Sequence, residues 1–216
     1  MWDARHILNG EGRPSLSATS INGIPGLDLQ AGDHICAFYS GPERDGILVP
    51  FLLEGLKDGD KCVCVVDATD LDGLMASLQA PSASDFLERR QLEFYTSEST
   101  YLAGGAFVPS RMMEFWDDNI RSALGEGGYT FVRLVGEMSW GLADLPGVDQ
   151  LVAYESELNR HIHRYPQVNI CLYDVERFSG AVILDTLKTH PSVLLNGMVV
   201  DNPYYVEPDV FLAGRG

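Results

Sequence analysis

The feature that most constrains this chain is a pair of short apolar runs separated by a glycine-bounded loop and an apolar stripe. The first run spans His34 to Ser40 and the second spans Cys62 to Val66. Between them, apolar side chains recur at helical spacing at Ile47, Leu48, Phe51, Leu52 and Leu56. The order strand, loop, helix, strand is a βαβ unit, and such a unit predicts a parallel sheet.

The loop between the first strand and the helix has the frame of a phosphate-binding loop without its chemistry. That motif, G-x-x-x-x-G-K-[ST], needs two glycines, a lysine for the outer phosphates and a hydroxyl for Mg²⁺. Gly41 and Gly46 are present, but Ile47 and Leu48 occupy the lysine and hydroxyl positions. Glu43 adds negative charge where phosphate would lie. We therefore expect the scaffold without nucleotide hydrolysis, and the alternative is a chance spacing of two glycines.

The start of the following helix is set by a proline. Pro50 predicts a helix that begins near Gly46, because the first turn of a helix leaves backbone N–H groups unpaired in any case. The preceding segment Gly23–Asp28 resembles the lead-in of RecA-superfamily ATPases of the circadian-clock type. The segment Phe51–Leu56 is similar to their first helix.

Length and charge limit the classes of partner. The 216 residues are 45% hydrophobic, which is enough for one substantial core. We expect a flexible arm over residues 1–22 and a single domain over residues 23–216. The chain carries 31 acidic and 15 basic residues, a formal charge of −16. Nucleic acids and anionic membranes attract clustered Lys and Arg, so this charge favours small molecules and other proteins as partners.

The sequence also indicates the cellular compartment of the protein. The N-terminus has no apolar signal segment, and no apolar run approaches the roughly 18 residues of a membrane span. The four cysteines all fall in predicted strands: Cys36, Cys62, Cys64 and Cys171. This placement is typical of reduced thiols in a core, and it predicts a cytoplasmic protein without a disulfide framework.

The rest of the chain continues to alternate strands and helices. Further strands are predicted at Leu92–Thr96, Tyr129–Val135, Val168–Tyr173, Met198–Val200 and Tyr204–Val206. Helical stripes are predicted at Leu71–Leu78, Ser110–Leu124, Val148–Ile162 and Ser179–Lys188, and the inward stripe of the third includes Glu155. The predicted fold is α/β, a three-layer αβα sandwich with a mostly parallel central sheet, RecA-like, with a degenerate P-loop.

A ligand site is expected where the strands end. Open α/β sheets bind ligands outside the carboxyl ends of their strands. The side chains that the chain order gathers there are acidic or aromatic, and those predicted to bind a ligand are Tyr39, Glu43, Glu137, Trp140 and Asp174. For Glu137 we prefer a ligand-orienting or fold-stabilising role, because the loop lacks the groups that would hold Mg²⁺ beside it.

His34 and Cys36 form a second candidate site. They lie two residues apart on one strand, so their side chains face the same side of the sheet. Both can bind a metal ion or haem iron, and both are included among the predicted ligand-binding residues. The alternative is a hydrogen-bonded core histidine beside a core thiol. Cys62 and Cys64 also share a face, but no second pair lies at zinc-finger distance.

Several blocks together resemble one family. They are Asp33–Tyr39 with Glu43, Phe51–Leu56, Arg133–Trp140, Tyr154–Glu155, Leu158–Asn159, Ile170–Asp174, His190–Pro191 and Asn202–Tyr204. In these blocks the chain resembles the MEDS domain, the DcmR-type sensory domain of methylotrophs and methanogens, from about Gly32 to Tyr204. The resemblance implies a RecA-type fold without nucleotide motifs and a sensor of small organic, hydrocarbon-derived ligands. Members are commonly attached to a helix-turn-helix or a histidine kinase.

Three functions follow as hypotheses. The leading one is a non-catalytic cytoplasmic sensory domain that binds a small organic ligand, at the strand ends or near His34 and Cys36, and regulates a kinase or transcription factor. The second is a metal- or haem-dependent redox sensor that uses His34 and Cys36, with Cys171 as a further ligand. The third is a ligand-free, partner-switching interaction module. Homo-oligomer formation stays open in all three, and no catalytic residue set is recognisable.

Overall fold

The structure is a computed structural model that describes residues 19–20, 28–67, 73, 76, 83–195 and 198–215. The predicted arm over 1–22 lies outside these residues except for Thr19–Ser20, which forms strand β1 and pairs antiparallel with β2 (Asp28–Leu29). The helical stripe predicted at Leu71–Leu78 lies outside them apart from Gly73 and Ala76.

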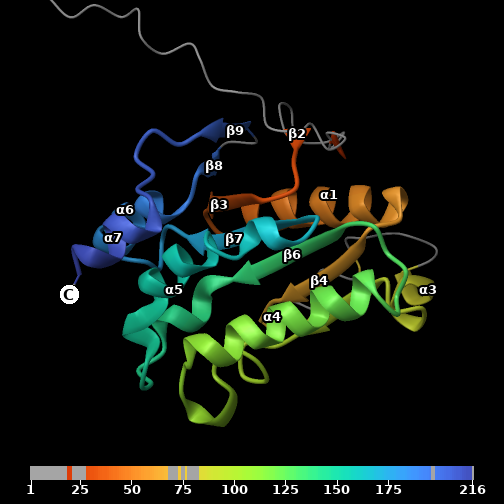
Figure 1. Cartoon of the computed structure of the whole chain (residues 1–216), viewed down its shortest axis with the longest axis horizontal. Coiled ribbons are helices and arrows are strands. Elements are labelled where there is room, and N and C mark those ends of the chain that lie inside the picture. Colours follow the sequence, from red (N-terminus) through yellow and green to blue (C-terminus); the bar gives the residue numbers. More distant parts are fainter. Residues whose placement is uncertain are drawn as a thin grey trace, which may run out of the picture.

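One sheet organises the described chain, and its strand order is β5-β4-β6-β7-β3-β8-β9 (Figure 1). The strands are β3 (Asp33–Tyr39), β4 (Lys61–Val65), β5 (Leu92–Tyr95), β6 (Val132–Glu137), β7 (Gln167–Asp174), β8 (Ser192–Leu195) and β9 (Met198–Asp201). All neighbouring pairs are parallel except β8 and β9, which run antiparallel. The predicted mostly parallel sheet is therefore confirmed.

Helices cover both faces of the sheet, as the three-layer prediction requires. The described helices are α1 (Glu43–Asp58), α3 (Ala83–Glu88), α4 (Pro109–Leu124), α5 (Leu151–Leu158), α6 (Gly180–Thr189) and α7 (Pro208–Ala213). Helices α1 and α3 pack on one face, and α4 to α7 pack on the other. Figure 1 shows α1 in orange and α4 in green on opposite sides of the strands.

The helix after the first strand begins earlier than predicted. Helix α1 begins at Glu43 rather than near Gly46, so Pro50 lies inside it and not in its first turn. The start is fixed at Ser40, whose backbone N–H donates to the Glu43 carboxylate at 3.0 Å while its carbonyl accepts from the Glu43 N–H. This reciprocal pairing satisfies orphan groups at the helix start and outweighs the positional preference of the proline.

Two further boundaries differ from the sequence prediction. The helix predicted up to Ile162 ends at Leu158, and a separate 3₁₀ turn follows at Ile162–Arg164. Near the C-terminus, β9 is present but Tyr204–Val206 is not a strand. The Tyr205 N–H instead donates to the carbonyl of Asn202 in a turn that leads into α7. Short apolar runs fit a turn beside a helix as well as a strand.

Candidate metal centre and strand-end cluster

The sheet places His34 and Cys171 next to each other on the face that α5 and α6 cover. In the register of β3 and β7, His34 lies opposite Asn169, and Cys36 lies opposite Cys171. The Cys171 sulfur is 3.4 Å from Nε2 of His34. Both residues are buried, as expected for the middle of a parallel sheet with helices on each face.

Two helices complete a group of four side chains. Glu155 projects from α5, and its Oε2 lies 3.2 Å from Nε2 of His34 and 3.0 Å from Nε2 of His190, the residue that ends α6. The two imidazole centroids are 4.0 Å apart. One possible ligand atom from each of His34, Glu155, Cys171 and His190 lies within 4.8 Å of the others. We call these four residues the buried centre.

Hydrogen bonds outside the buried centre fix the tautomer of both histidines. Nδ1 of His190 lies 2.9 Å from the Thr186 carbonyl oxygen, which can only accept, so Nδ1 carries the proton. Nδ1 of His34 lies 3.0 Å from Oδ1 of Asn159. The Asn159 amide nitrogen donates to three backbone carbonyls, so its oxygen faces His34 as an acceptor. In the neutral state, therefore, both Nε2 atoms present lone pairs to the Glu155 carboxylate.

One hydrogen bond lies inside the buried centre, between the Cys171 thiol and Nε2 of His34 at 3.4 Å, whereas the contacts of Glu155 are close but are not hydrogen bonds. Both Glu155 oxygens and Nε2 of His190 are buried without a hydrogen-bond partner. Burial works to raise the pKa of Glu155, but the adjacent His190 and His34 outweigh it and lower that pKa to about 2. Burial and the neighbouring His34 lower the pKa of His190. A carboxylate thus faces two imidazoles without a well-directed proton between them.

A single metal ion fits this arrangement. Tetrahedral sites with bonds of about 2.0 to 2.3 Å have ligand atoms about 3.3 to 3.6 Å apart. Three of the six separations here are 3.0, 3.2 and 3.4 Å, and all six lie within 4.8 Å, so small side-chain shifts would complete the site. Histidine ligands of metals usually donate their second N–H to a carbonyl or amide oxygen, as both do here. The spacing suits an ion between the four side chains rather than the wide plane of a haem.

Cys36 lies beside the buried centre and is not among its four residues. Its sulfur is directed to the backbone carbonyl of Ser192 at 3.7 Å. Burial, and next the charge of Glu155, raises the pKa of this thiol well above its ordinary value. The predicted pair of His34 and Cys36 thus shares a face of the sheet, but the atoms that converge with His34 belong to other residues.

Two of the five strand-end residues predicted to bind a ligand, Tyr39 and Glu137, belong to a separate cluster around Glu137. Its carboxylate accepts a hydrogen bond from the Tyr39 hydroxyl at 3.2 Å and from the Asp67 backbone N–H at 3.1 Å. The guanidinium of Arg44, a buried residue of α1, lies 3.3 Å from the same carboxylate. Burial and the charge of Glu137 raise the pKa of Tyr39. An internal ion pair therefore lies beside the phosphate-loop frame.

The other predicted residues take part in local structure. Glu43 pairs with Ser40 at the start of α1, and Asp174 accepts a hydrogen bond from the Glu176 backbone N–H in the turn after β7. Trp140 is buried and stacks on Tyr101, with ring centroids 4.6 Å apart. Their role as ligand-binding residues stays a prediction.

The comparisons with known proteins identify the family. Residues 33–191 match the family described as "MEDS: MEthanogen/methylotroph, DcmR Sensory domain". The chain belongs to this family. It is also 31% identical over 191 residues to the transcriptional repressor DcmR of Methylorubrum extorquens. The aligned region covers 84% of this chain and 67% of that protein. The MEDS match spans all four residues of the buried centre.

Solved structures show what fold this MEDS chain shares. A KaiC-like protein, PH0186 from Pyrococcus horikoshii OT3, matches with a TM-score of 0.59 and 13% identity, over 83% of this chain and 80% of that one. The flagellar accessory protein FlaH from Methanocaldococcus jannaschii matches with a TM-score of 0.51 and 12% identity, over 85% and 84%. The likeness confirms the RecA-like α/β fold. No described helix is long and apolar enough to cross a membrane.

Sequence reasoning missed two members of the buried centre. From the sequence, His190 is named only within the block His190–Pro191, and Glu155 is named within a block and as one position in an inward-facing stripe. Glu155 carried a usable signal, because a carboxylate within an apolar stripe must be paired or ligated when it is buried. His190 precedes a proline and has no such pattern, so only the fold brings it to Glu155.

Proposed function

We propose that this MEDS chain is a non-catalytic sensory domain that holds a divalent metal ion in the buried centre and regulates a partner protein. The observation that carries the proposal is the pair of Nε2 lone pairs directed at Oε2 of Glu155. Lone pairs facing a carboxylate repel it unless a proton or a metal cation lies between them. Burial, and next the neighbouring His34, lowers the pKa of His190, which disfavours the proton. Protonating both imidazoles would instead place two positive rings 4.0 Å apart in a dry core.

Charge balance favours a buried centre that holds a zinc ion over one that is empty. A Zn²⁺ ion, the Glu155 carboxylate and a Cys171 thiolate sum to zero charge, which suits a buried position. Burial, and next the charge of Glu155, raises the pKa of Cys171 in the protein alone, whereas a bound metal ion deprotonates a coordinating thiol. Two nitrogens, one sulfur and one oxygen are all donor types that bind zinc, and four buried protein ligands without an open position suit a structural rather than a catalytic ion.

The phosphate-loop region supports a non-catalytic role. Arg44 and Glu137 are both buried and lie 3.3 Å apart beside the loop, where a nucleotide-hydrolysing relative of this fold would need a lysine and a free acidic residue. Glu137 is further held by Tyr39 and by the Asp67 backbone. These contacts use the carboxylate for stability of the strand ends and oppose binding of a triphosphate.

The output is a regulatory contact with another protein. The DcmR relative is a transcriptional repressor, and we propose that this chain likewise acts through a regulatory partner, such as a transcription factor or kinase. Helices α5 and α6 supply or flank two of the four residues of the buried centre. On the same side of the sheet, Leu184 of α6 and Val210 of α7 are exposed apolar side chains that a partner can cover.

Metal content and spectroscopy test the proposal. We expect about one zinc per chain in freshly purified protein, and thiolate-to-metal absorption after exchange with Co²⁺. Cys171→Ser and His190→Ala should abolish the absorption. The matched controls Cys36→Ser and His161→Ala, which leave the buried centre intact, should keep it. A folded protein that takes up neither zinc nor Co²⁺, or one that loses the absorption only on Cys36→Ser, would contradict the proposal.

A further inference from the structure

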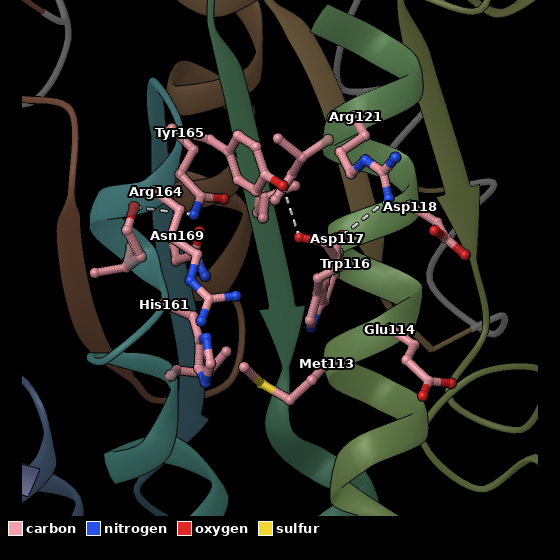
Figure 2. A pocket seen from close by; sticks show the side chains of 15 residues that line it. Met113, Glu114, Trp116, Asp117, Asp118, Arg121, His161, Arg164, Tyr165 and Asn169 are labelled. Atoms are coloured by element: carbon pink, nitrogen blue, oxygen red, sulfur yellow. Dashed lines mark hydrogen bonds and ion pairs between the residues drawn. The ribbon is translucent and has the colours of Figure 1, made fainter. Parts of the chain in front are cut away.

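A pocket of 510 Å³ opens between α4, the 3₁₀ turn Ile162–Arg164 and strands β6 and β7. None of the seven residues predicted to bind a ligand lines it. Figure 2 shows the space between helix α4 on one side and the segment that carries His161, Arg164 and Tyr165 on the other. The volume is in the range of pockets that bind small molecules.

Two buried acceptors in this pocket lack partners. The side-chain oxygens of Gln167 and Asn169, which are 4% and 6% exposed, accept no hydrogen bond. The Gln167 amide is oriented, because its nitrogen donates to the Ile162 carbonyl at 3.0 Å. An unpaired buried acceptor destabilises the fold, so two in one pocket point to a ligand that donates hydrogen bonds.

The remaining wall is apolar at depth and charged at the rim. Trp116, Ile120, Leu134, Leu158 and Ile162 supply the apolar part. At the rim, Asp117 is engaged by the Tyr165 hydroxyl at 2.9 Å and by Arg121 at 3.7 Å. Glu114 and Asp118 are exposed and point away from the pocket in Figure 2. Arg164 also lines the pocket and is exposed. The charged side chains of the lining are thus half-buried or exposed, and the buried part of the wall is apolar apart from the amides of Gln167 and Asn169.

We propose that this pocket binds a small neutral organic molecule with an apolar body and at least one O–H or N–H donor, which pairs with Asn169 and Gln167. The inference rests on the proposed sensory role but does not need the metal ion. An analogue without the donor should bind much more weakly, because it leaves the two oxygens unpaired.

The pocket adjoins the buried centre at two points. Asn169 lies between Leu134 of β6 and His34 of β3 in the sheet, so the occupant's hydrogen-bond partner is the direct neighbour of a buried-centre histidine. Leu158 lines the pocket, and the next residue, Asn159, holds Nδ1 of His34. A ligand that moves Asn169 or Leu158 therefore changes the position of His34.

Fluorine NMR with two matched probes tests the pocket. We expect 4-fluorobenzyl alcohol to bind saturably and at least tenfold more tightly than 4-fluorotoluene, which lacks the hydroxyl. Asn169→Leu should reduce this preference to less than threefold. The control Gln150→Leu makes a similar change at an exposed position and should leave the preference intact. Absence of saturable binding, or an unchanged preference in Asn169→Leu, overturns the proposal.

A second measurement does not depend on any variant folding. Intermolecular nuclear Overhauser effects should join the probe's ring protons to the methyl groups of Leu134 and Leu158, and effects to other leucines alone would overturn the assignment. In Co²⁺-loaded protein, saturating alcohol should shift the cobalt bands, and unshifted bands overturn the coupling to His34. If the protein takes up no cobalt, the metal proposal fails, while probe binding to metal-free protein still decides the pocket.

Discussion

The two faces of the sheet each bury a carboxylate with basic partners, and they treat it differently. On the α1 face, Arg133 of β6 donates from Nε to Asp60 at 2.7 Å and from Nη1 to the Phe51 carbonyl at 3.1 Å. On the α5 face, Glu155 meets His34 and His190 at similar distances without a hydrogen bond. Directed donors satisfy the first carboxylate, whereas the second has two close imidazole neighbours and no hydrogen bond to either oxygen.

This difference divides the buried charges of one core into two classes, those that stabilise the fold and those that serve a function. A buried ion pair whose atoms are all paired holds elements together, and it is costly to break. A buried group of ligand-type side chains without directed protons is stable only with a further partner. The predictions below test whether the two carboxylates behave as these two classes.

The largest effect is expected at the satisfied pair. Arg133→Met should lower the free energy of unfolding by about 3 to 5 kcal/mol, because it leaves the Asp60 carboxylate buried and unpaired. Urea denaturation measures this. Arg160→Met is the control at an exposed ion pair, where the cost should stay below about 1 kcal/mol. Equal costs for the two variants would show that burial of the Arg133 pair contributes nothing special.

The next effect should appear at Glu155 and depend on metal. Zinc at a hundredfold excess over its dissociation constant should stabilise the wild type by about 3 kcal/mol. Glu155→Gln should lose most of this gain. In chelator, the variant should match or exceed the wild type, because an amide N–H can donate to an imidazole Nε2. Urea denaturation with zinc and with chelator gives all four values.

One result at Glu155 would place both carboxylates in the structural class. If Glu155→Gln destabilises the protein equally with zinc and with chelator, the buried centre is a structural network like that of Arg133.

A smaller effect separates two glycines of α1. A Cβ at Gly55 would lie 2.5 Å from Cδ and Nε of Arg133, so Gly55→Ala should cost about 1 to 3 kcal/mol. A Cβ at Gly46 meets nothing within 4 Å, so Gly46→Ala should stabilise the helix by up to about 1 kcal/mol. Thermal unfolding of both variants measures the difference. Equal shifts would mean that the Arg133 side chain moves aside freely.

The smallest effect concerns the mostly buried ion pair of Lys61 and Glu93 at the edge of the sheet. Burial works to raise the pKa of Glu93, but Lys61 and Arg90 outweigh it and lower that pKa. Because the folded pKa lies below the unfolded value of about 4.3, the stabilisation is complete above that pH and is lost as pH falls through the folded pKa. Glu93→Gln should therefore cost about 1 kcal/mol at pH 7 and nothing near pH 3. A cost that persists near pH 3 would assign it to packing.

Sequence reasoning predicted six of the seven strands of the large sheet, missed β8 (Ser192–Leu195), and predicted the buried centre in part. The strands around His34 and Cys64 were recognisable because short apolar runs with flanking glycines have few other solutions. His34 was predicted as a ligand for the same reason, as a polar residue inside such a run. Glu155 and His190 come from distant helices, and only the packing of α5 and α6 on β3 and β7 brings them together.

The pocket could not have been predicted from local pattern at all. Its volume depends on the distance between α4 and the turn at Ile162–Arg164. The sequence instead predicted one continuous helix from Val148 to Ile162. The carboxyl-end rule directed attention to Glu137, where the structure shows a closed ion pair. Rules derived from a fold apply less well where the loop chemistry has changed.

The central position of β3 has a consequence for synthesis of the chain on the ribosome. This strand is synthesised well before both of its sheet neighbours, β7 and β8, and His34 is 137 residues from Cys171. Until then, β3 has two unpaired edges and an apolar face, which are features that promote aggregation. Contacts so distant along the chain also slow folding. Production of this protein should therefore depend on chaperones that shield the nascent N-terminal half until β8 is complete.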